Sequence, residues 1–295
     1  MRHLSLLLLL TACAAETAPK HNPADPDPRS EDPSLWPEDL FGIDSERPAG
    51  VYAPSDYSWD EHGMLPVIVL LHGYSVNSGI QELMFQIKAR RNEGYIAILP
   101  EGTENELGLR FWNATEACCG AGSDVDDVGY LLSLIDEAEE HFPVDPDRIL
   151  LTGHSNGGYM SHRLACDAAD RIAGIASLAG STFDRKAQCK ASEPVAMLQM
   201  HGDEDATIYY DGSSAYPGAV ETTKRWSKTN GCSGSVEDPD RDYVDSLDGD
   251  DTTVIRYEDC EASTELWTHL GSGHTPAFND TWRDDMLNWL LAQRR

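Results

Sequence analysis

Short, continuous apolar runs alternate with segments of helical periodicity along most of the chain. The first run, Pro66–Leu71, is bounded by its proline and by His72-Gly73, which predicts a strand buried on both faces. Further runs of similar length fall at 95–99, 148–152, 172–178, 195–200 and 266–270. Strands that alternate with helices in this way predict an α/β fold, a mostly parallel sheet with helices on both faces.

Three segments between or after these runs have the apolar spacing of amphipathic helices. The first has its apolar face at Ile80, Leu83, Met84 and Ile87. We expect that helix to end at Gly94. The second has its apolar face at Val128, Leu131, Leu132 and Ile135, with Ser123 or Asp124 as its N-cap. The last begins at Asp280 and presents a core-packing face at Trp282, Met286, Trp289 and Leu290.

The start of the chain follows a different pattern. Residues Met1–Cys13 have a basic beginning, an apolar run too short to span a bilayer, and then small residues, which predicts a secretory signal. The signal ends in Leu10-Thr11-Ala12-Cys13, which is similar to the lipobox whose cysteine is diacylated; an ordinary signal peptide cleaved nearby is the alternative. The proline-rich segment 14–40 is expected to be a disordered tether, followed by one domain over 41–295.

The charge balance excludes one class of partner. Lys plus Arg number 22 and Asp plus Glu number 51, for a formal net charge of −29, so the chain repels nucleic acid. The acidic stretch Glu237–Asp251 could suggest a calcium site, but it lacks the D-x-D-x-D-G register and the closing glutamate. A solvated loop is therefore favoured, and no metal or cofactor is expected.

Six cysteines remain after Cys13, and an even number in an exported protein predicts three disulfides. Because Cys118 and Cys119 are adjacent, we expect each to reach a different partner. The adjacent pair would then take Cys166 and Cys189, and the remaining bridge would join Cys232 to Cys260. A zinc site is disfavoured, because the chain has no C-x-x-C pair and no clustered histidines.

The strongest chemical signal is the segment Gly153-His154-Ser155-Asn156-Gly157. It joins a predicted strand to a helical stretch, the context in which G-x-S-x-G forms a nucleophile elbow. The glycines permit the sharp turn that exposes the serine hydroxyl above the sheet. Ser155 is therefore predicted to be a nucleophile; a tight turn with an idle serine is the alternative.

A serine nucleophile needs a base that an acid holds in place. The strand at 195–200 leads into His201-Gly202-Asp203-Glu204-Asp205, which places carboxylates at the edge of the sheet where ligand sites lie. The loop Gly271-Ser272-Gly273-His274 precedes the last helix and supplies the base, His274.

Two backbone N–H groups are predicted to stabilise the oxyanion, those of Asn156 and Tyr74. The other histidines are interpreted as structural. His154 and His201 would form local hydrogen bonds, and His269 lies within an alternating strand pattern.

With these motifs in place, the chain resembles the polyhydroxybutyrate depolymerase and feruloyl esterase group of α/β-hydrolases, which also contains acetyl xylan esterases. The resemblance rests on LLHGY at 70–74, FWNATEACCG at 111–120, VDDVGYLLSLI at 125–135, GHSNGGYMSHRLAC at 153–166, HGDEDATIYY at 201–210 and GSGH at 271–274. It implies that Asp205, rather than Asp203 or Asp211, is the acid. One departure is Thr275-Pro276 where depolymerase-like members have Trp-Pro.

The function expected from residues and resemblance together is that of an exported, monomeric serine esterase attached to membrane only through a lipid at Cys13, in the cell envelope or outside the cell. Its substrates would be feruloyl or acetyl esters of plant polysaccharide, or short polyhydroxyalkanoate esters. A serine peptidase of the same fold and a catalytically inactive binding protein are the alternatives.

Overall fold

The computed structural model describes residues 39–41, 47–120 and 123–295. The predicted leader, the lipidation site Cys13 and the tether up to residue 38 lie outside the described residues. The first described element is β1 (Asp39–Phe41), which pairs with β2 (Ala49–Tyr52). This pairing starts slightly before residue 41, the domain boundary predicted from the sequence.

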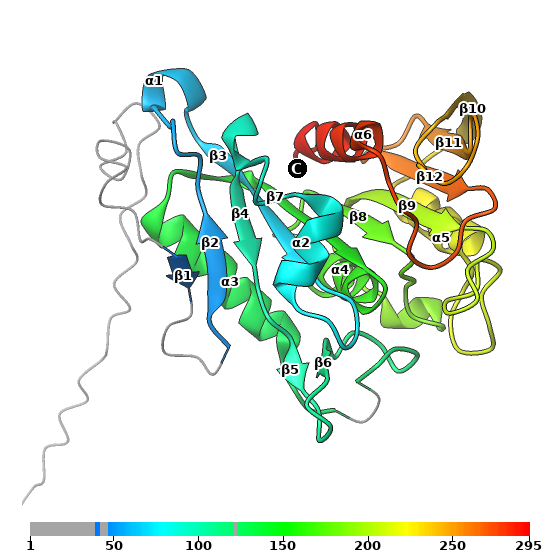
Figure 1. Cartoon of the computed structure of the whole chain (residues 1–295), viewed down its shortest axis with the longest axis horizontal. Helices are drawn as coiled ribbons and strands as arrows, with labels where there is room; N and C mark the ends of the chain where they lie inside the picture. Colours follow the sequence, from blue (N-terminus) through cyan, green and yellow to red (C-terminus); the bar gives the residue numbers. More distant parts are fainter. Residues whose placement is uncertain (1–38, 42–46, 121–122) are drawn as a thin grey trace, which may run out of the picture.

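Within the described residues, ten strands form one sheet in the order β1-β2-β4-β3-β7-β8-β9-β12-β11-β10 (Figure 1). The central strands are parallel and match the predicted apolar runs: β4 (Ile96–Leu99), β3 (Leu65–Leu71), β7 (Val144–His154), β8 (Gly174–Leu178), β9 (Ala196–Gly202) and β12 (Thr264–His269). Antiparallel strands extend both edges, namely β1 and β2 at one and β11 (Thr252–Glu258) and β10 (Gly234–Arg241) at the other. The predicted α/β-hydrolase architecture is confirmed.

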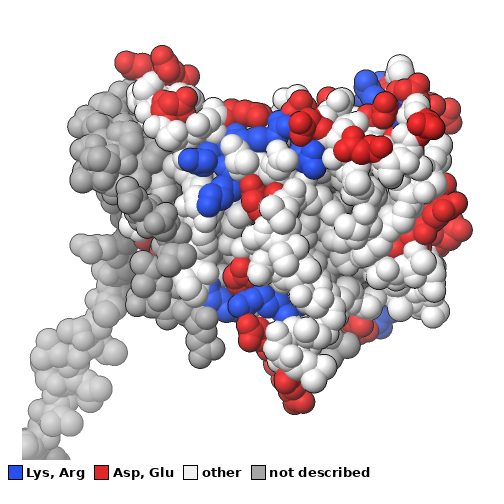
Figure 2. Space-filling view, in the orientation of Figure 1, with Lys and Arg blue, Asp and Glu red and all other residues white. Residues whose placement is uncertain are grey.

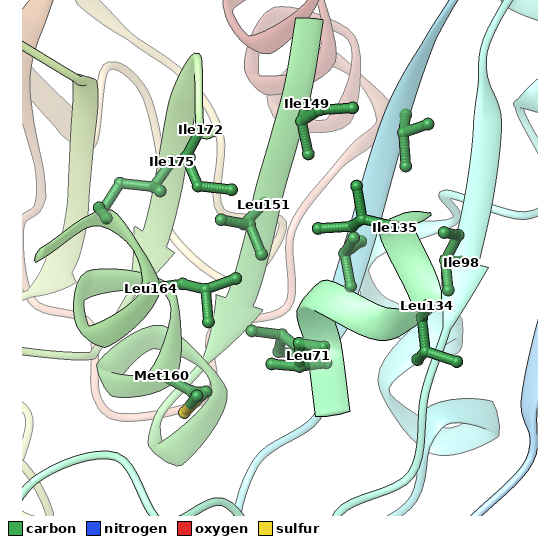
Figure 3. Packing of buried hydrophobic residues seen from close by; sticks show 14 of the residues in the cluster. Leu71, Ile98, Leu134, Ile135, Ile149, Leu151, Met160, Leu164, Ile172 and Ile175 are labelled. Atoms are coloured by element: carbon green, nitrogen blue, oxygen red, sulfur yellow. The ribbon is translucent and has the colours of Figure 1, made fainter. Parts of the chain in front are cut away.

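Helices cover both faces of the sheet. One face packs against α3 (Asp127–His141), α4 (Asn156–Asp167) and α5 (Ala219–Thr229), and the other against α2 (Ser78–Phe85) and α6 (Asp280–Leu291). Successive side chains of β3 point to opposite faces of the sheet. Because helices cover both faces, all residues of β3 are buried. Figure 3 shows Leu134 and Ile135 of α3 and Met160 and Leu164 of α4 directed toward the strands.

Smaller elements complete the described chain. They are α1 (Trp59–His62), the 3-10 turns η3 (Arg91–Glu93) and η4 (Lys186–Gln188), and the two-stranded pair β5 (Thr103–Glu104) and β6 (Arg110–Phe111). Among helices of the described residues, none has the length and hydropathy needed to cross a bilayer.

The helix α2 forms where expected, but it buries a different face. Ile80 and Leu83 are 53% and 76% exposed, whereas Gln81 and Phe85 are buried. Gln81 turns inward because its Oε1 accepts a hydrogen bond from the Gly73 amide at 3.0 Å. The helix also ends at Phe85 rather than at Gly94, since the left-handed Gln86 terminates it.

The N-cap of α3 also differs from the expectation of Ser123 or Asp124. Asp126 caps the helix, with its Oδ1 accepting from the Gly129 amide at 2.8 Å. The last helix, α6, packs into the core through Trp282, Met286 and Leu290 as predicted.

The disulfide pairing corrects one expectation and confirms another. Cys118 bonds to its neighbour Cys119, while Cys166 pairs with Cys189. The end of α4 lies against the segment after η4, with 4.8 Å between the Cα atoms of Cys166 and Cys189, so neither is left for the adjacent pair. The predicted Cys232–Cys260 bridge is present.

The acidic stretch 237–251 is only partly a loop. Its beginning belongs to the exposed edge strand β10, and Asp251 at its end is buried, accepting hydrogen bonds from the Val244 amide and the Thr252 hydroxyl. No group of three or more potential ligand side chains in the described part of the chain is arranged to hold a metal ion.

Cationic side chains are few, and many form ion pairs. Figure 2 shows them on this face beside α6, above β5 and β6, and near β10 and β11, next to carboxylates. Arg90 pairs with Asp284, and Arg110 with Glu104. Further carboxylates are exposed on this face, whereas Asp127, Asp205 and Asp251 are buried.

Candidate active site

Ser155 occupies the turn between β7 and α4. Its backbone has φ 54° and ψ −118°, a left-handed conformation that is costly for a residue with a side chain. The turn is tight because α4 begins directly against β3: a Cβ at Gly157 would lie 2.1 Å from the Leu71 carbonyl oxygen. The sequence G-x-S-x-G thus forms the predicted elbow, with Ser155 only 8% exposed.

Asp205 and His274 come together because they follow neighbouring parallel strands. β9 and β12 pair in register from Thr264 to His269, so the loops after them start side by side. A Cβ at Gly202 would lie 2.3 Å from the Ser272 carbonyl oxygen, so this approach requires glycine. The outcome is a hydrogen bond of 2.6 Å from His274 Nδ1 to Asp205 Oδ2.

The surroundings of Asp205 favour its ionised form. Burial by itself would raise the pKa of this carboxyl, but hydrogen bonds from His201 and His274 oppose that effect. The amides of Thr207 and Ile208 also donate to Oδ1, at 2.8 and 2.9 Å. Together these donors hold the pKa of Asp205 well below its usual range, so it is a charged acceptor for His274.

Asp203, the nearest competing carboxylate, has a different partner. Its Oδ1 accepts a hydrogen bond of 2.6 Å from the Gly271 amide. The contact holds the start of the loop that carries His274. The structure therefore brings Asp205, and not Asp203, to the imidazole.

His154 contacts His274 across the chain rather than forming a local hydrogen bond. Its Nε2–H donates to the His274 carbonyl oxygen at 2.8 Å, and the two ring centroids are 4.6 Å apart. Burial, reinforced by repulsion from His274, lowers the pKa of His154 to about 4. A neutral imidazole therefore packs the elbow against the loop of His274.

The loop after β3 passes beside the elbow. A Cβ at Gly73 would lie 3.6 Å from the Ser155 Cβ. The next amide, that of Tyr74, has no hydrogen-bond acceptor among the described residues. The amide of Asn156 is the first of α4, where helical N–H groups lack an acceptor within the helix. Both predicted oxyanion donors thus lie in segments adjoining Ser155.

The side chain of Asn156 has a role that the sequence did not reveal. Its Oδ1 accepts from the Trp112 amide at 2.6 Å, and its Nδ2 donates to the Trp112 carbonyl at 3.0 Å. The Trp112 indole in turn donates to the His72 carbonyl at 3.0 Å. These bonds tie the elbow to the segment before Tyr74 through one buried tryptophan.

A buried carboxylate extends this framework to the start of α3. Asp127 Oδ2 accepts from the Asn113 amide at 2.6 Å, and Oδ1 accepts from Arg47 at 2.6 Å. The motifs at 111–120 and 125–135 are therefore parts of one structural unit that supports the elbow. In the sequence, the only indication of this structural role was that the two motifs match the family although ester hydrolysis does not require them.

A polar cavity of about 570 Å³ lies beside this unit. Its lining includes Asn113, Thr115, Glu116, Ser123, Arg163 and Lys190. Asn113 directly follows Trp112, which places the cavity next to the support of the elbow. Amide, hydroxyl and charged groups make the cavity suited to a polar, hydrogen-bonding ligand.

Comparison with known proteins gives one family match across most of the chain. The model of the Esterase family, described as "Putative esterase", matches residues 42–293. Feruloyl esterase B of Piromyces equi is 29% identical over 239 residues, which cover 75% of this chain and 41% of that protein. The bifunctional acetylxylan esterase/xylanase XynS20E of Neocallimastix patriciarum is 23% identical over 248 residues, 82% of this chain and 33% of that protein. The chain thus spans less than half the length of these relatives.

Solved structures share the fold. An acetyl xylan esterase from Aspergillus awamori superposes with a TM-score of 0.63 at 14% identity, covering 86% of this chain and 97% of that one. A carboxylesterase from Bacillus cereus superposes with a TM-score of 0.51, also at 14% identity, over 83% of this chain and 94% of that one.

Proposed function

The chain belongs to the Esterase family, and we propose that it hydrolyses carboxylic esters with Ser155 as nucleophile, His274 as general base and Asp205 as the acid that orients His274. The observation that carries this proposal is the hydrogen bond of 2.6 Å between His274 Nδ1 and Asp205 Oδ2, formed by loops that follow neighbouring strands. Ser155 lies at the same edge of the sheet, at the end of β7.

The proposed reaction follows from the proton positions. Because His274 donates its Nδ1–H to Asp205, its Nε2 carries the lone pair that accepts the Ser155 proton. The serine oxygen bonds to the ester carbonyl carbon, and the amides of Tyr74 and Asn156 stabilise the resulting oxyanion. Collapse expels the alcohol, which takes the proton from His274. His274 then takes a proton from water, whose oxygen attacks the acyl carbon, and collapse returns that proton to the Ser155 oxygen as the carboxylic acid leaves.

The proposed substrates are feruloyl or acetyl esters of plant polysaccharide. The names of the relatives, feruloyl esterase and acetylxylan esterase, support this class. Short hydroxyalkanoate oligomers are the competing substrate class, and their rate of hydrolysis should be compared with that of the polysaccharide esters.

The direct test is release of p-nitrophenol from acetate and butyrate esters, followed by methyl ferulate, acetylated xylan and hydroxybutyrate oligomers side by side. We expect Ser155→Ala to lower kcat/KM at least about 10⁴-fold, because the nucleophile is lost while the fold is kept. Ser133→Ala, at an exposed position of α3, is the control and should retain full activity. If a fluorophosphonate probe leaves Ser155 unmodified in the folded wild type, the proposed mechanism is wrong.

We further propose that the protein is exported and lipid-anchored at Cys13. Export is supported by the leader-like sequence and by three disulfides, which persist in oxidising compartments. Mass spectrometry of the mature N-terminus should find diacylated Cys13, and Cys13→Ser should release the protein from membranes. A mature chain that begins elsewhere with an unmodified residue would refute the anchor and leave export standing.

A further inference from the structure

A buried row of polar side chains leads from α5 to Asp205. Its members come from three elements and a loop, and each is at most 4% exposed: Trp226, His162, Gln199, His201 and Asp205. Gln199 stands in the middle of β9, between apolar neighbours. Buried polar groups are costly unless they are hydrogen-bonded, so the way these groups are paired is informative.

The indole of Trp226 sets the direction of the first hydrogen bond. Its Nε1 lies 3.0 Å from His162 Nδ1, and an indole N–H can only donate. His162 Nδ1 must therefore carry a lone pair. Burial lowers the pKa of His162 to about 4, so the ring is neutral and its proton is on Nε2. That N–H donates to Gln199 Oε1 at 3.0 Å.

The amide of Gln199 is oriented independently by the backbone. Its Nε2 donates to the Gly180 carbonyl at 3.0 Å, and a carbonyl oxygen can only accept. The opposite amide orientation would place two acceptors together at Gly180 and two donors together at His162. The same Nε2 lies 3.3 Å from His201 Nδ1, which is consequently the acceptor.

The row ends at the carboxylate. With its lone pair on Nδ1, His201 carries its proton on Nε2, which lies 2.8 Å from the Ile208 carbonyl and 3.3 Å from Asp205 Oδ2. His274 binds the same carboxylate oxygen at 2.6 Å. The donors of Trp226, His162 and Gln199 thus follow one another toward His201, whose Nε2–H faces both the Ile208 carbonyl and Asp205.

We propose that His162, Gln199 and His201 form a positioning chain that keeps an N–H of His201 directed at Asp205 and thereby holds this carboxylate for His274. This inference rests on the proposed role of Asp205. The chain residues do not touch the substrate; they act through the tautomer of His201. If that proton moved to Nδ1, a lone pair on Nε2 would face both the Ile208 carbonyl and the carboxylate.

The amides of Thr207 and Ile208 bind the other carboxylate oxygen, Oδ1, and the other side chains that interact electrostatically with Asp205 do not replace the His201 donor. They are His274 from the loop after β12, His154 from the end of β7, and the Tyr159 hydroxyl from α4. His154 donates its N–H to the His274 carbonyl instead. Without the His201 donor, Asp205 Oδ2 would keep only the hydrogen bond from His274.

The first experiment reads the tautomers without any substrate. In protein labelled with ¹⁵N-histidine, two-bond nitrogen–proton NMR correlations at pH 7 should show His162 and His201 both neutral and both protonated on Nε2. The result is expected to be the same in Ser155→Ala. A His201 protonated on Nδ1, or doubly protonated, would overturn the positioning chain.

The second experiment breaks the row at its far end. Trp226→Phe removes the indole N–H but touches none of Ser155, Asp205 and His274. We expect kcat on p-nitrophenyl acetate to fall between about twofold and tenfold with KM unchanged, because one neutral hydrogen bond is lost. The spectrum should show His201 partly protonated on Nδ1. Gln199→Met, of similar shape and without polar atoms, should give the larger loss.

The matched control is Trp282→Phe. That indole is equally buried on the opposite face of the sheet, and its N–H has no hydrogen-bond partner among the described residues. The Trp282→Phe substitution should lower the free energy of unfolding but leave kcat and the His201 tautomer unchanged. Equal kcat losses in Trp226→Phe and Trp282→Phe would show that the buried row contributes to activity only through core packing, and would overturn the proposal.

The two proposals fail in different ways. A folded wild type without esterase activity would refute the proposed function and, with it, the positioning role. An active enzyme whose His201 is protonated on Nδ1 would refute the positioning chain alone.

Discussion

A single side chain, that of Asn156, joins the elbow to the rest of the site. It follows the nucleophile, and its amide pairs with both backbone groups of the buried Trp112. No other residue type of this size offers a donor and an acceptor side by side in the way that a peptide group requires. The local motif alone explains the glycines around Ser155, whereas Asn156 is explained only by its long-range partner.

We predict that Asn156→Ala destabilises the protein by about 1–3 kcal/mol, because the Trp112 N–H would remain buried without a partner, while the Trp112 C=O would keep only the hydrogen bond from the Ala114 amide. Urea unfolding measures the loss, and esterase activity should fall with it as the elbow loses its support. Asn288→Ala, at an exposed position of α6, is the control and should change the unfolding free energy by no more than about 0.5 kcal/mol. Equal stability of the two variants would contradict this role.

At the scale of elements, two disulfides close long loops: one joins segments outside the sheet, and the other closes the open end of the paired strands β10 and β11. Cys166–Cys189 joins the end of α4 to the segment after η4, and Cys232–Cys260 joins the segment between α5 and β10 to the turn between β11 and β12. They enclose sequence separations of 23 and 28 residues, whereas Cys118–Cys119 encloses a separation of 1. Only the first two restrict the unfolded chain over a long segment.

We therefore expect Cys166→Ala/Cys189→Ala to lower the free energy of unfolding by about 3 kcal/mol, the chain-entropy value for a loop of this length. Cys118→Ala/Cys119→Ala should cost clearly less, since no long loop is opened. Denaturant unfolding of both double variants in oxidising buffer gives the comparison. A larger loss from the adjacent pair would show that its main contribution is to the folded turn.

Across the whole molecule, buried neutral histidines couple stability to pH. Burial lowers the pKa of His154 and His162 to about 4 and that of His269 to about 3. In the unfolded chain each should titrate near its ordinary value of about 6.5. Between these values the unfolded chain binds more protons than the folded one, so stability falls as the pH falls through this window.

We predict a decrease in unfolding free energy from pH 7 to pH 5, with a slope of up to about 1.4 kcal/mol per pH unit for each of these histidines. Urea titrations at pH 7, 6 and 5 measure it. His269→Gln, which removes one titrating group away from Ser155, should reduce the slope. A flat profile over this range would mean that these imidazoles can be protonated without loss of the fold.

The net charge of −29 acts on the molecule as a whole. Because carboxylates greatly outnumber cations, self-repulsion should destabilise the compact state at low ionic strength. We expect the unfolding free energy at pH 7 to rise as salt is raised from about 0.01 M to about 1 M, since screening shortens the reach of this repulsion. Sodium and potassium chloride should act equally; stability that falls with salt would contradict this prediction.

The amino-acid sequence was sufficient to predict the parallel strands, the elbow at Ser155 and the loops that carry Asp205 and His274. These features depend on local periodicity, turn chemistry and the order of residues along the chain, which a sequence records directly. Even the choice of Asp205 over Asp203 came from resemblance to a family rather than from local pattern.

Which distant groups meet could be established only from the packing of the folded chain. It turned Gln81 inward and left Ile80 exposed, paired Cys118 with Cys119, joined Asn156 to Trp112 and aligned His162 and Gln199 with His201. The physical reason is that a buried polar group is placed by the partner that satisfies it. That partner lies on another element, so its identity depends on how the elements pack.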